Sequence, residues 1–60
     1  MDREAIKQFR LKLGLSQEAF ARRIGVTVLT VRRWEKGSFK PSPLALMRIE
    51  GLLKEMGDKK

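Results

Sequence analysis

Apolar residues recur at every third or fourth position along most of the chain, which is the spacing of one face of an α-helix. The first stretch carries this spacing at Ile6, Phe9 and Leu13, and later stretches carry it around Phe20 and Trp34. No stretch alternates apolar and polar residues for long enough to compete as a β-strand. The pattern therefore predicts an all-α fold.

Glycines mark the ends of these periodic stretches, and residues that cap helices mark their starts. The glycines are Gly14, Gly25, Gly37 and Gly57. The residues whose side-chain oxygen can accept a hydrogen bond from a free backbone N–H are Asp2, Ser16, Thr27 and Ser42. Pro43 directly follows Ser42, at the first helical position that suits proline. The sequence thus predicts four helices, at about residues 3–13, 17–24, 28–36 and 43–56.

The segment 17–36 has the spacing of two short helices that cross at a steep angle. Such a crossing needs a small residue where the helices meet and a residue that tolerates positive φ in the turn. Ala21 is the small residue, and Gly25 follows it in the turn. Apolar residues fill the other inward positions: Phe20, Ile24, Val26, Val31 and Trp34. This pattern predicts a helix-turn-helix, in which the helix at 28–36 would enter a DNA major groove.

The net positive charge of the chain indicates that this small helical domain binds a polyanion. The 60-residue chain has 14 Lys and Arg against 7 Asp and Glu, for a net charge of +7. Between Arg22 and Lys40 there are six basic residues and one acid, so five of the seven net charges fall in this stretch. Such a basic surface favours nucleic acid or an acidic membrane. The basic residues do not stand opposite a continuous apolar stripe, which disfavours the membrane.

Residue types that the chain lacks exclude several classes of function. With no His and no Cys, the chain has no disulfide, no thiolate or imidazole metal ligand and no imidazole base. Its carboxylates form no dense cluster and it has no Gly-rich phosphate loop, so an enzyme is the weakest hypothesis, and we expect no metal and no cofactor. No apolar run exceeds four residues, so we expect no membrane span and a cytoplasmic, nucleoid-associated protein.

Four short motifs stand in a characteristic order along the chain. They are Leu13-Gly14-Leu15-Ser16-Gln17, Ala21 with Gly25, Trp34-Glu35-Lys36-Gly37, and Lys40-Pro41-Ser42. In order and spacing they resemble the Cro/CI-type (XRE) helix-turn-helix family of phage and bacterial repressors. The resemblance implies a single compact four-helix domain of the lambda-repressor type over residues 1–60, with the helix-turn-helix at 17–36. It also implies binding to double-stranded DNA.

The resemblance implies two sets of DNA-contacting positions. The positions that face the bases are Thr27, Val28, Leu29, Arg32, Arg33 and Lys36. The positions that approach the phosphate backbone are Gln17 and the loop residues Ser38, Lys40 and Ser42. We also assign the basic Arg22 and Arg23 to the phosphate backbone, although a run of charge on a helix is often only a solvated face. In the family the Gln that opens the second helix also braces the third, although an exposed Gln in a first turn needs no such role.

The resemblance also implies a structural ion pair between Arg10 and Glu35. In relatives, the matching residues join the first helix to the third as a partly buried pair. Removal of one partner would leave an uncompensated buried charge, so we expect these two residues to support the fold rather than to contact DNA.

The chain departs from the family where base specificity is decided. Val28 and Leu29 stand where many relatives carry Gln or Ser, which can hydrogen-bond to base edges. Apolar side chains there can contact thymine methyl groups, or else pack locally or face a partner protein. Base readout then falls to Arg32 and Arg33, whose guanidinium groups suit guanine O6 and N7. Either arginine can instead hold only phosphates, as half or more of protein–DNA hydrogen bonds do.

Two features point to contacts with other molecules. Phe39, in the loop after the third helix, either tucks under the fourth helix or packs against sugar rings or a dimer partner. The fourth helix has more apolar surface than one core-facing stripe needs, and Gly51 inside it suggests a close approach of another helix. We expect a homodimer through the C-terminal half of this helix. The expected interface residues are Leu52, Leu53 and Met56.

These observations leave two hypotheses of function. The leading one is a sequence-specific transcriptional regulator, a repressor that binds an inverted-repeat operator as a homodimer with the helix at 28–36 in the major groove. The alternative is an antitoxin-like interaction module that binds a toxin partner and its own promoter. The apolar Val28 and Leu29 and the surplus apolar surface of the fourth helix favour the alternative.

Overall fold

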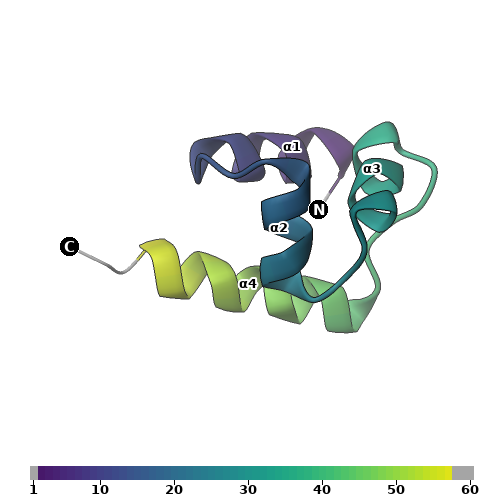
Figure 1. The fold of residues 1–60 in the computed structure, drawn as a ribbon. Coiled ribbons are helices and arrows are strands. Elements are labelled where there is room, and N and C mark those ends of the chain that lie inside the picture. The colour runs from purple at the N-terminus through teal and green to yellow at the C-terminus, as the bar shows by residue number, and fades with distance from the viewer. Residues whose placement is uncertain (1, 58–60) are drawn as a thin grey trace.

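The computed structural model describes residues 2–57, which form four α-helices and no strand. The helices are α1 (Arg3–Lys12), α2 (Gln17–Ile24), α3 (Val28–Lys36) and α4 (Pro43–Gly57). The all-α fold is therefore confirmed, and every boundary lies within one residue of the predicted one. Leu13, predicted to end the first helix, instead caps α1. In Figure 1, α2 runs between α1 and α4, and α3 stands at one end of the molecule.

Each helix begins at the capping residue that the sequence predicts. Asp2, Ser16 and Thr27 accept hydrogen bonds from the backbone N–H three residues further on, at 2.8, 3.0 and 3.2 Å. Ser42 Oγ accepts in the same way from the N–H of Ala45 at 3.2 Å, across Pro43. These short-range bonds satisfy N–H groups that the first turn of a helix leaves without partners. The caps thus fix where each helix starts.

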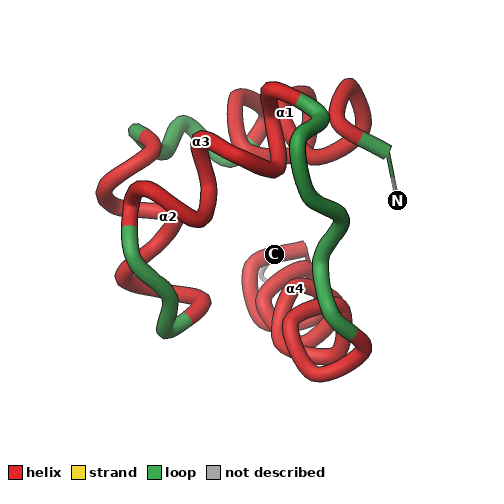
Figure 2. Tube along the Cα trace, turned by 90° about the vertical axis from the view of Figure 1, so that its right-hand side faces the viewer, coloured by secondary structure: helices red, strands yellow, loops and turns green. Residues whose placement is uncertain are grey.

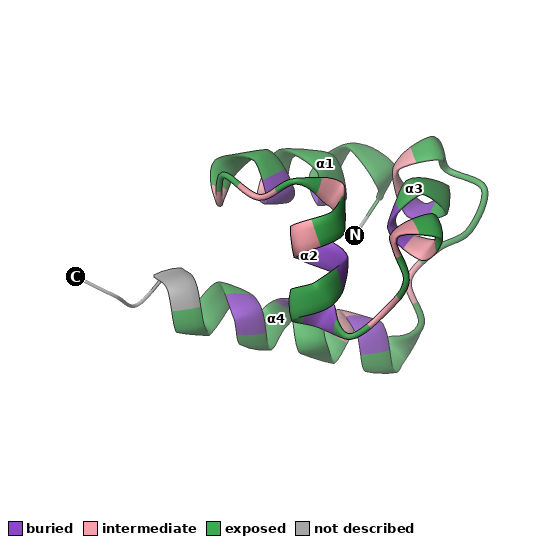
Figure 3. Ribbon diagram, in the orientation of Figure 1, coloured by how far each residue is buried: buried purple, intermediate pink, exposed green. Residues whose placement is uncertain are grey.

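The core forms where α2 packs against α3 and α4, and where α1 packs against α3. Its buried apolar residues are Ile6, Phe20, Ala21, Ile24, Val31, Trp34, Ala45, Ile49 and Leu52. Leu15 and Val26 pack against this core from the connections before and after α2. Phe9 meets Phe20 edge to face, with ring centroids 6.0 Å apart. Figure 3 shows the buried segments of α2, α3 and α4 turned towards one another.

Two arginines from distant parts of the chain cap the C-terminal ends of α2 and α3, the two helices of the helix-turn-helix. Arg48 Nη1 of α4 donates to the carbonyl of Ile24 at 3.2 Å, and Arg3 Nη1 of α1 donates to the carbonyl of Lys36 at 3.5 Å. A positive charge is favourable at a helix C-terminus, where carbonyl groups lack partners. Arg48 thereby ties α4 to α2, and Arg3 ties α1 to α3.

The arrangement leaves the outer side of α3 uncovered. Figures 1 and 2 show α1 and α4 on different sides of α2, with neither of them crossing the outer side of α3. The loop from residue 38 to residue 42 leads away from the end of α3 to the start of α4. The second helix of the helix-turn-helix is therefore free to meet a large ligand.

Candidate nucleic-acid interface

Basic side chains are exposed to solvent along the outer side of α3. Arg32, Arg33 and Lys36 are all exposed. Leu29, which is half exposed, lies one turn before Arg33 on the same side of the helix. Together with residues of α2 and of the following loop they line a shallow hollow: Gln17, Leu29, Arg32, Arg33, Glu35, Lys36, Ser38 and Phe39. We call this surface the α3 face.

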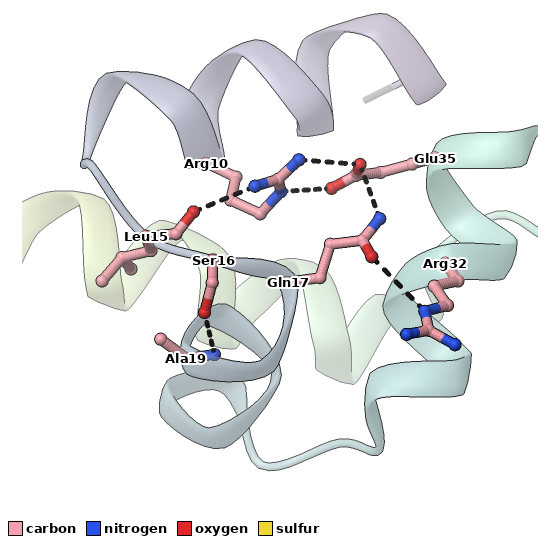
Figure 4. Close-up of polar contacts among 7 residues, drawn as sticks. All are labelled: Arg10, Leu15, Ser16, Gln17, Ala19, Arg32 and Glu35. Atoms are coloured by element: carbon pink, nitrogen blue, oxygen red, sulfur yellow. Dashed lines mark hydrogen bonds and ion pairs between the residues drawn. The ribbon is translucent and has the colours of Figure 1, made fainter.

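A buried ion pair holds α3 against α1 behind the α3 face. Arg10 Nε donates to Glu35 Oε2 at 2.6 Å, and Arg10 Nη2 donates to Glu35 Oε1 at 3.1 Å. The two side chains are only 10% and 7% exposed. The third nitrogen, Arg10 Nη1, donates to the carbonyl of Leu15 at 2.9 Å, so the whole guanidinium group has partners. The pair that the family resemblance implied is therefore present (Figure 4).

The surroundings of Glu35 lower the pKa of its carboxyl group. Burial alone would raise the pKa of this carboxyl group, because a charge is costly in a poorly solvated place. Hydrogen bonds from Arg10 and Gln17, and the positive charges of Arg10 and Lys7, outweigh burial and lower the pKa below the usual 4.5. Glu35 is thus a charged anchor at neutral pH.

Gln17 connects this anchor to the α3 face. From the first turn of α2, Gln17 Nε2 donates to Glu35 Oε1 at 3.2 Å. Arg32 Nε in turn donates to Gln17 Oε1 at 3.4 Å. Figure 4 shows the Gln17 side chain lying between Glu35 and Arg32. Gln17 therefore braces α3, which the resemblance implied, and it also fixes one edge of the Arg32 guanidinium.

Two of the residues predicted to face bases have local partners. Val28 is half-buried and packs against the core, because it lies one turn before the buried Val31. Local packing was the alternative for this residue. Thr27 is exposed, but its Oγ1 caps α3 and lies 2.9 Å from the hydroxyl of Thr30. Of the two apolar residues at this end of α3, Leu29 is the one that stands in the open.

The residues predicted to hold phosphates do not all share one surface. Ser38 lines the hollow of the α3 face together with Gln17, and Lys40 is exposed in the next part of the loop. Arg22 and Arg23 line a different hollow, between α2 and α4, where Arg23 Nη1 lies 3.8 Å from Glu55 Oε1. The structure thus separates these two arginines from the hollow of the α3 face. Ser42, the remaining predicted residue, caps α4.

Phe39 corrects one expectation of the sequence analysis. It does not tuck under α4 but is 58% exposed, with the guanidinium carbon of Arg33 5.3 Å from its ring centroid. The backbone explains the position. The N–H groups of Ser38 and Phe39 both point to the carbonyl of Arg33, at 3.0 and 3.5 Å, and keep the start of the loop against the end of α3.

The residues expected at the dimer interface differ in how far they are buried. Leu52 is only 6% exposed and belongs to the core of its own chain, so it is not free to meet a second copy, and the expectation for this residue is corrected. Leu53 is 50% exposed on α4. The side chain of Met56, the third expected interface residue, lies outside the described part of the structure.

The sequence model of the helix-turn-helix family matches residues 6–55, which include all of α2 and α3 and most of α1 and α4. The chain belongs to this family. It is of the Cro/CI (XRE) type, a family of DNA-binding transcriptional regulators, and relatives of the chain are described as HTH-type transcriptional regulators. The family is therefore one of regulators rather than of enzymes.

Curated relatives have the same general description. A protein of Methanothermobacter thermautotrophicus, described as an uncharacterized HTH-type transcriptional regulator, is 45% identical over 47 residues, which are 78% of this chain and 68% of that protein. A regulator of the same description from Archaeoglobus fulgidus is 45% identical over 67% of this chain and 56% of its own. YgzD of Bacillus subtilis is 41% identical over 73% of this chain and 67% of its own. No solved structure gives a significant match.

The described residues contain neither a candidate membrane span nor a candidate metal cluster. No helix in residues 2–57 is long and apolar enough to cross a membrane. Within the same part of the chain, no three carboxylate, thiol or imidazole side chains are placed to share a metal ion.

Proposed function

We propose that the chain is a sequence-specific regulator that places α3 in the major groove of double-stranded DNA and represses transcription from an inverted-repeat operator as a homodimer. The observation that carries the proposal is the α3 face. Three exposed basic side chains stand on a helix that a buried ion pair holds in place. In this proposal, residues 1–60 act as one domain, on DNA in the cytoplasm.

Each side chain of the α3 face has chemistry suited to a different part of DNA. Arg33, like Arg32, offers a planar set of N–H donors that fits the O6 and N7 acceptors of guanine. Leu29 offers apolar surface to the methyl group of a thymine. Gln17 and Ser38 line the hollow, and Lys40 is exposed in the loop beyond Ser38. Side chains of these kinds bind phosphate oxygens and fix the register without reading sequence.

A homodimer would give the proposed operator its symmetry. Two copies related by a twofold axis would present two α3 helices to half-sites whose centres lie about one helical turn apart, roughly 34 Å. Leu53, exposed on the C-terminal half of α4, supports a contact between copies at a distance from the α3 face.

Selection of bound duplexes from a random pool tests the proposal. We expect an inverted repeat to emerge, with guanine in each half-site, and binding that weakens steeply as salt rises. Arg33→Ala should relax the preference at one base pair, by about 1–3 kcal/mol of discrimination. Lys40→Ala should weaken binding to all duplexes alike and reduce the salt slope by about one. A wild-type protein without preference among duplexes would contradict the proposal.

A second candidate function is the antitoxin-like module, which binds a toxin partner and its own promoter. The observation in its favour is the exposed apolar surface on the N-terminal half of α4, where Leu44 and Met47 are 58% and 67% exposed. A partner protein bound in a stoichiometric complex, together with no sequence preference on DNA, would favour this function over the first.

A further inference from the structure

Phe39 is an exposed aromatic ring that the core does not use. It lies in the loop after α3, is 58% exposed, and has the Arg33 guanidinium over its face at 5.3 Å from the ring centroid. The negative π-face of the ring attracts the cation, and at an exposed site the attraction is modest. The ring contributes little to the fold, and its described contact is with a residue of the α3 face.

The backbone conformation at the C-terminal end of α3 places the Phe39 ring beside Arg33. Gly37 takes the left-handed conformation, with φ at +86°, and turns the chain back over the last turn of α3. The N–H groups of Ser38 and Phe39 then share the carbonyl of Arg33 as acceptor. The residue that carries the ring is therefore hydrogen-bonded to the residue that carries the guanidinium group.

The contact with Phe39 leaves the N–H donors of Arg33 available to DNA. The cation lies over the face of the ring, and the N–H donors of a guanidinium group lie in the plane of that group and at its edge. A long side chain held in this way loses less freedom when it binds. The remaining edge can make two parallel hydrogen bonds to guanine O6 and N7. Leu29, one turn earlier on α3, supplies apolar surface in the same hollow.

We infer that Phe39 is a positioning residue, whose ring holds the Arg33 guanidinium for the O6 and N7 edge of a guanine. Leu29 beside it contacts the methyl group of a neighbouring thymine. The DNA recognised is thus a duplex with a thymine next to a guanine in each half-site. This inference rests on the proposed function, and it names the base step that the α3 face reads.

The test uses the duplex selected by the wild-type protein and the guanine at which Arg33→Ala loses its preference. That guanine is replaced by 7-deazaguanine, which lacks the N7 acceptor, or by inosine, which keeps N7 and O6. Phe39→Ala should weaken binding to the guanine and inosine duplexes about two- to fivefold and weaken binding to the 7-deazaguanine duplex less, since that base keeps only the O6 acceptor. Phe39→Trp should restore the wild-type ratio, and Phe39→Leu should not.

Controls separate positioning from other roles of the ring. Met47→Ala, at another exposed apolar residue, should change none of these affinities. Equal losses for Phe39→Ala on the guanine and 7-deazaguanine duplexes would overturn the inference, since the ring would then contact backbone or sugar. A Phe39→Leu variant with wild-type ratios would overturn it as well. Thermal unfolding of each variant, expected within a few degrees of wild type, guards against a loss of fold.

A second pair of measurements tests the thymine. Replacing the neighbouring thymine by deoxyuridine removes one methyl group, and wild-type affinity should fall about three- to fourfold. The Leu29→Ala variant should bind both duplexes equally, and wild-type indifference to the methyl group would overturn this part of the inference. If the wild-type protein selects no sequence at all, the proposed function fails. If it selects a guanine that Phe39 does not affect, only the inference fails.

Discussion

At the scale of single residues, Glu35 determines most directly how α3 is held. Its carboxylate accepts from Arg10 of α1 and from Gln17 of α2, so three helices meet at one side chain. Arg32 then attaches to the same network through Gln17. The position of a DNA-facing arginine therefore depends on a buried charge that itself contacts no DNA in our proposal.

Replacing Glu35 should cost far more stability than replacing a surface acid. Glu35→Ala leaves the buried Arg10 guanidinium without its anion, and we expect a loss of about 3 kcal/mol in the free energy of unfolding. Glu55→Ala removes the partner of an exposed ion pair and should cost no more than about 0.5 kcal/mol. Urea unfolding measures both. Equal losses would show that Glu35 is not an anchor.

The same residue should make stability depend on pH. The pKa of Glu35 is lowered in the folded chain, so the folded state holds the charged form more tightly than the unfolded chain does. Its contribution is complete above about pH 4.5 and is lost as the pH falls through the lowered folded pKa. We expect Glu35→Gln to flatten the acid side of the stability curve. An acid side as steep in Glu35→Gln as in the wild type would contradict this expectation.

Contacts between residues far apart in the sequence could be predicted only where the family resemblance supplied them. Arg10, Gln17 and Glu35 were predicted because a family resemblance carries their relationship across the chain. Arg3 and Arg48 were missed, since each caps a helix at least 24 residues away, and no local pattern marks which surface arginine will reach it.

At the scale of elements, the helix ends were the most predictable feature. Asp2, Ser16, Thr27 and Ser42 cap their helices through bonds to the N–H three residues on, and such bonds are encoded within one turn. The path of the loop after α3 was not predictable in the same way. The sequence left two positions open for Phe39, under the fourth helix or against another molecule, and hydrogen bonds from Ser38 and Phe39 to the carbonyl of Arg33 keep it beside the α3 face.

The turn between α2 and α3 should tolerate a side chain less well than the turn before α2. Gly14 and Gly25 both have positive φ, at +72° and +88°, so an alanine at either should cost about 1 kcal/mol. An added Cβ at Gly14 meets nothing within 4 Å, whereas at Gly25 it would lie 2.7 Å from Arg48 Nη1. Gly25→Ala should therefore also displace the arginine that caps α2, and urea unfolding should show the larger loss there.

Arg48→Ala provides the control for this comparison. In that background the alanine at Gly25 no longer displaces a cap, so its cost should fall to the cost measured for Gly14→Ala. A Gly25→Ala loss that is unchanged by Arg48→Ala would show that backbone conformation alone decides the effect.

At the scale of the whole molecule, α3 and the C-terminal half of α4 lie at opposite ends of the described chain. The α3 face stands at one end, and the C-terminal half of α4 extends towards the other (Figure 1). The spacing of apolar residues could not tell Leu52 from Leu53, because adjacent stripes on α4 are both apolar. Packing against α2 decides between them, and it buries Leu52 while leaving Leu53 exposed. The surplus surface predicted for α4 is therefore narrower than its sequence suggests.

Leu53 is the described residue on which the proposed homodimer can be tested without disturbing the core. We expect the wild-type chain to sediment as a dimer at micromolar concentration, and Leu53→Glu to sediment as a monomer that keeps its helical fold. Its affinity for an inverted repeat should fall towards its affinity for a single half-site. Met47→Glu adds the same charge at a residue on the N-terminal half of α4 and should remain dimeric. A wild-type chain that sediments only as a monomer, both free and on the inverted repeat, would rule the homodimer out and leave α3 to read one half-site alone.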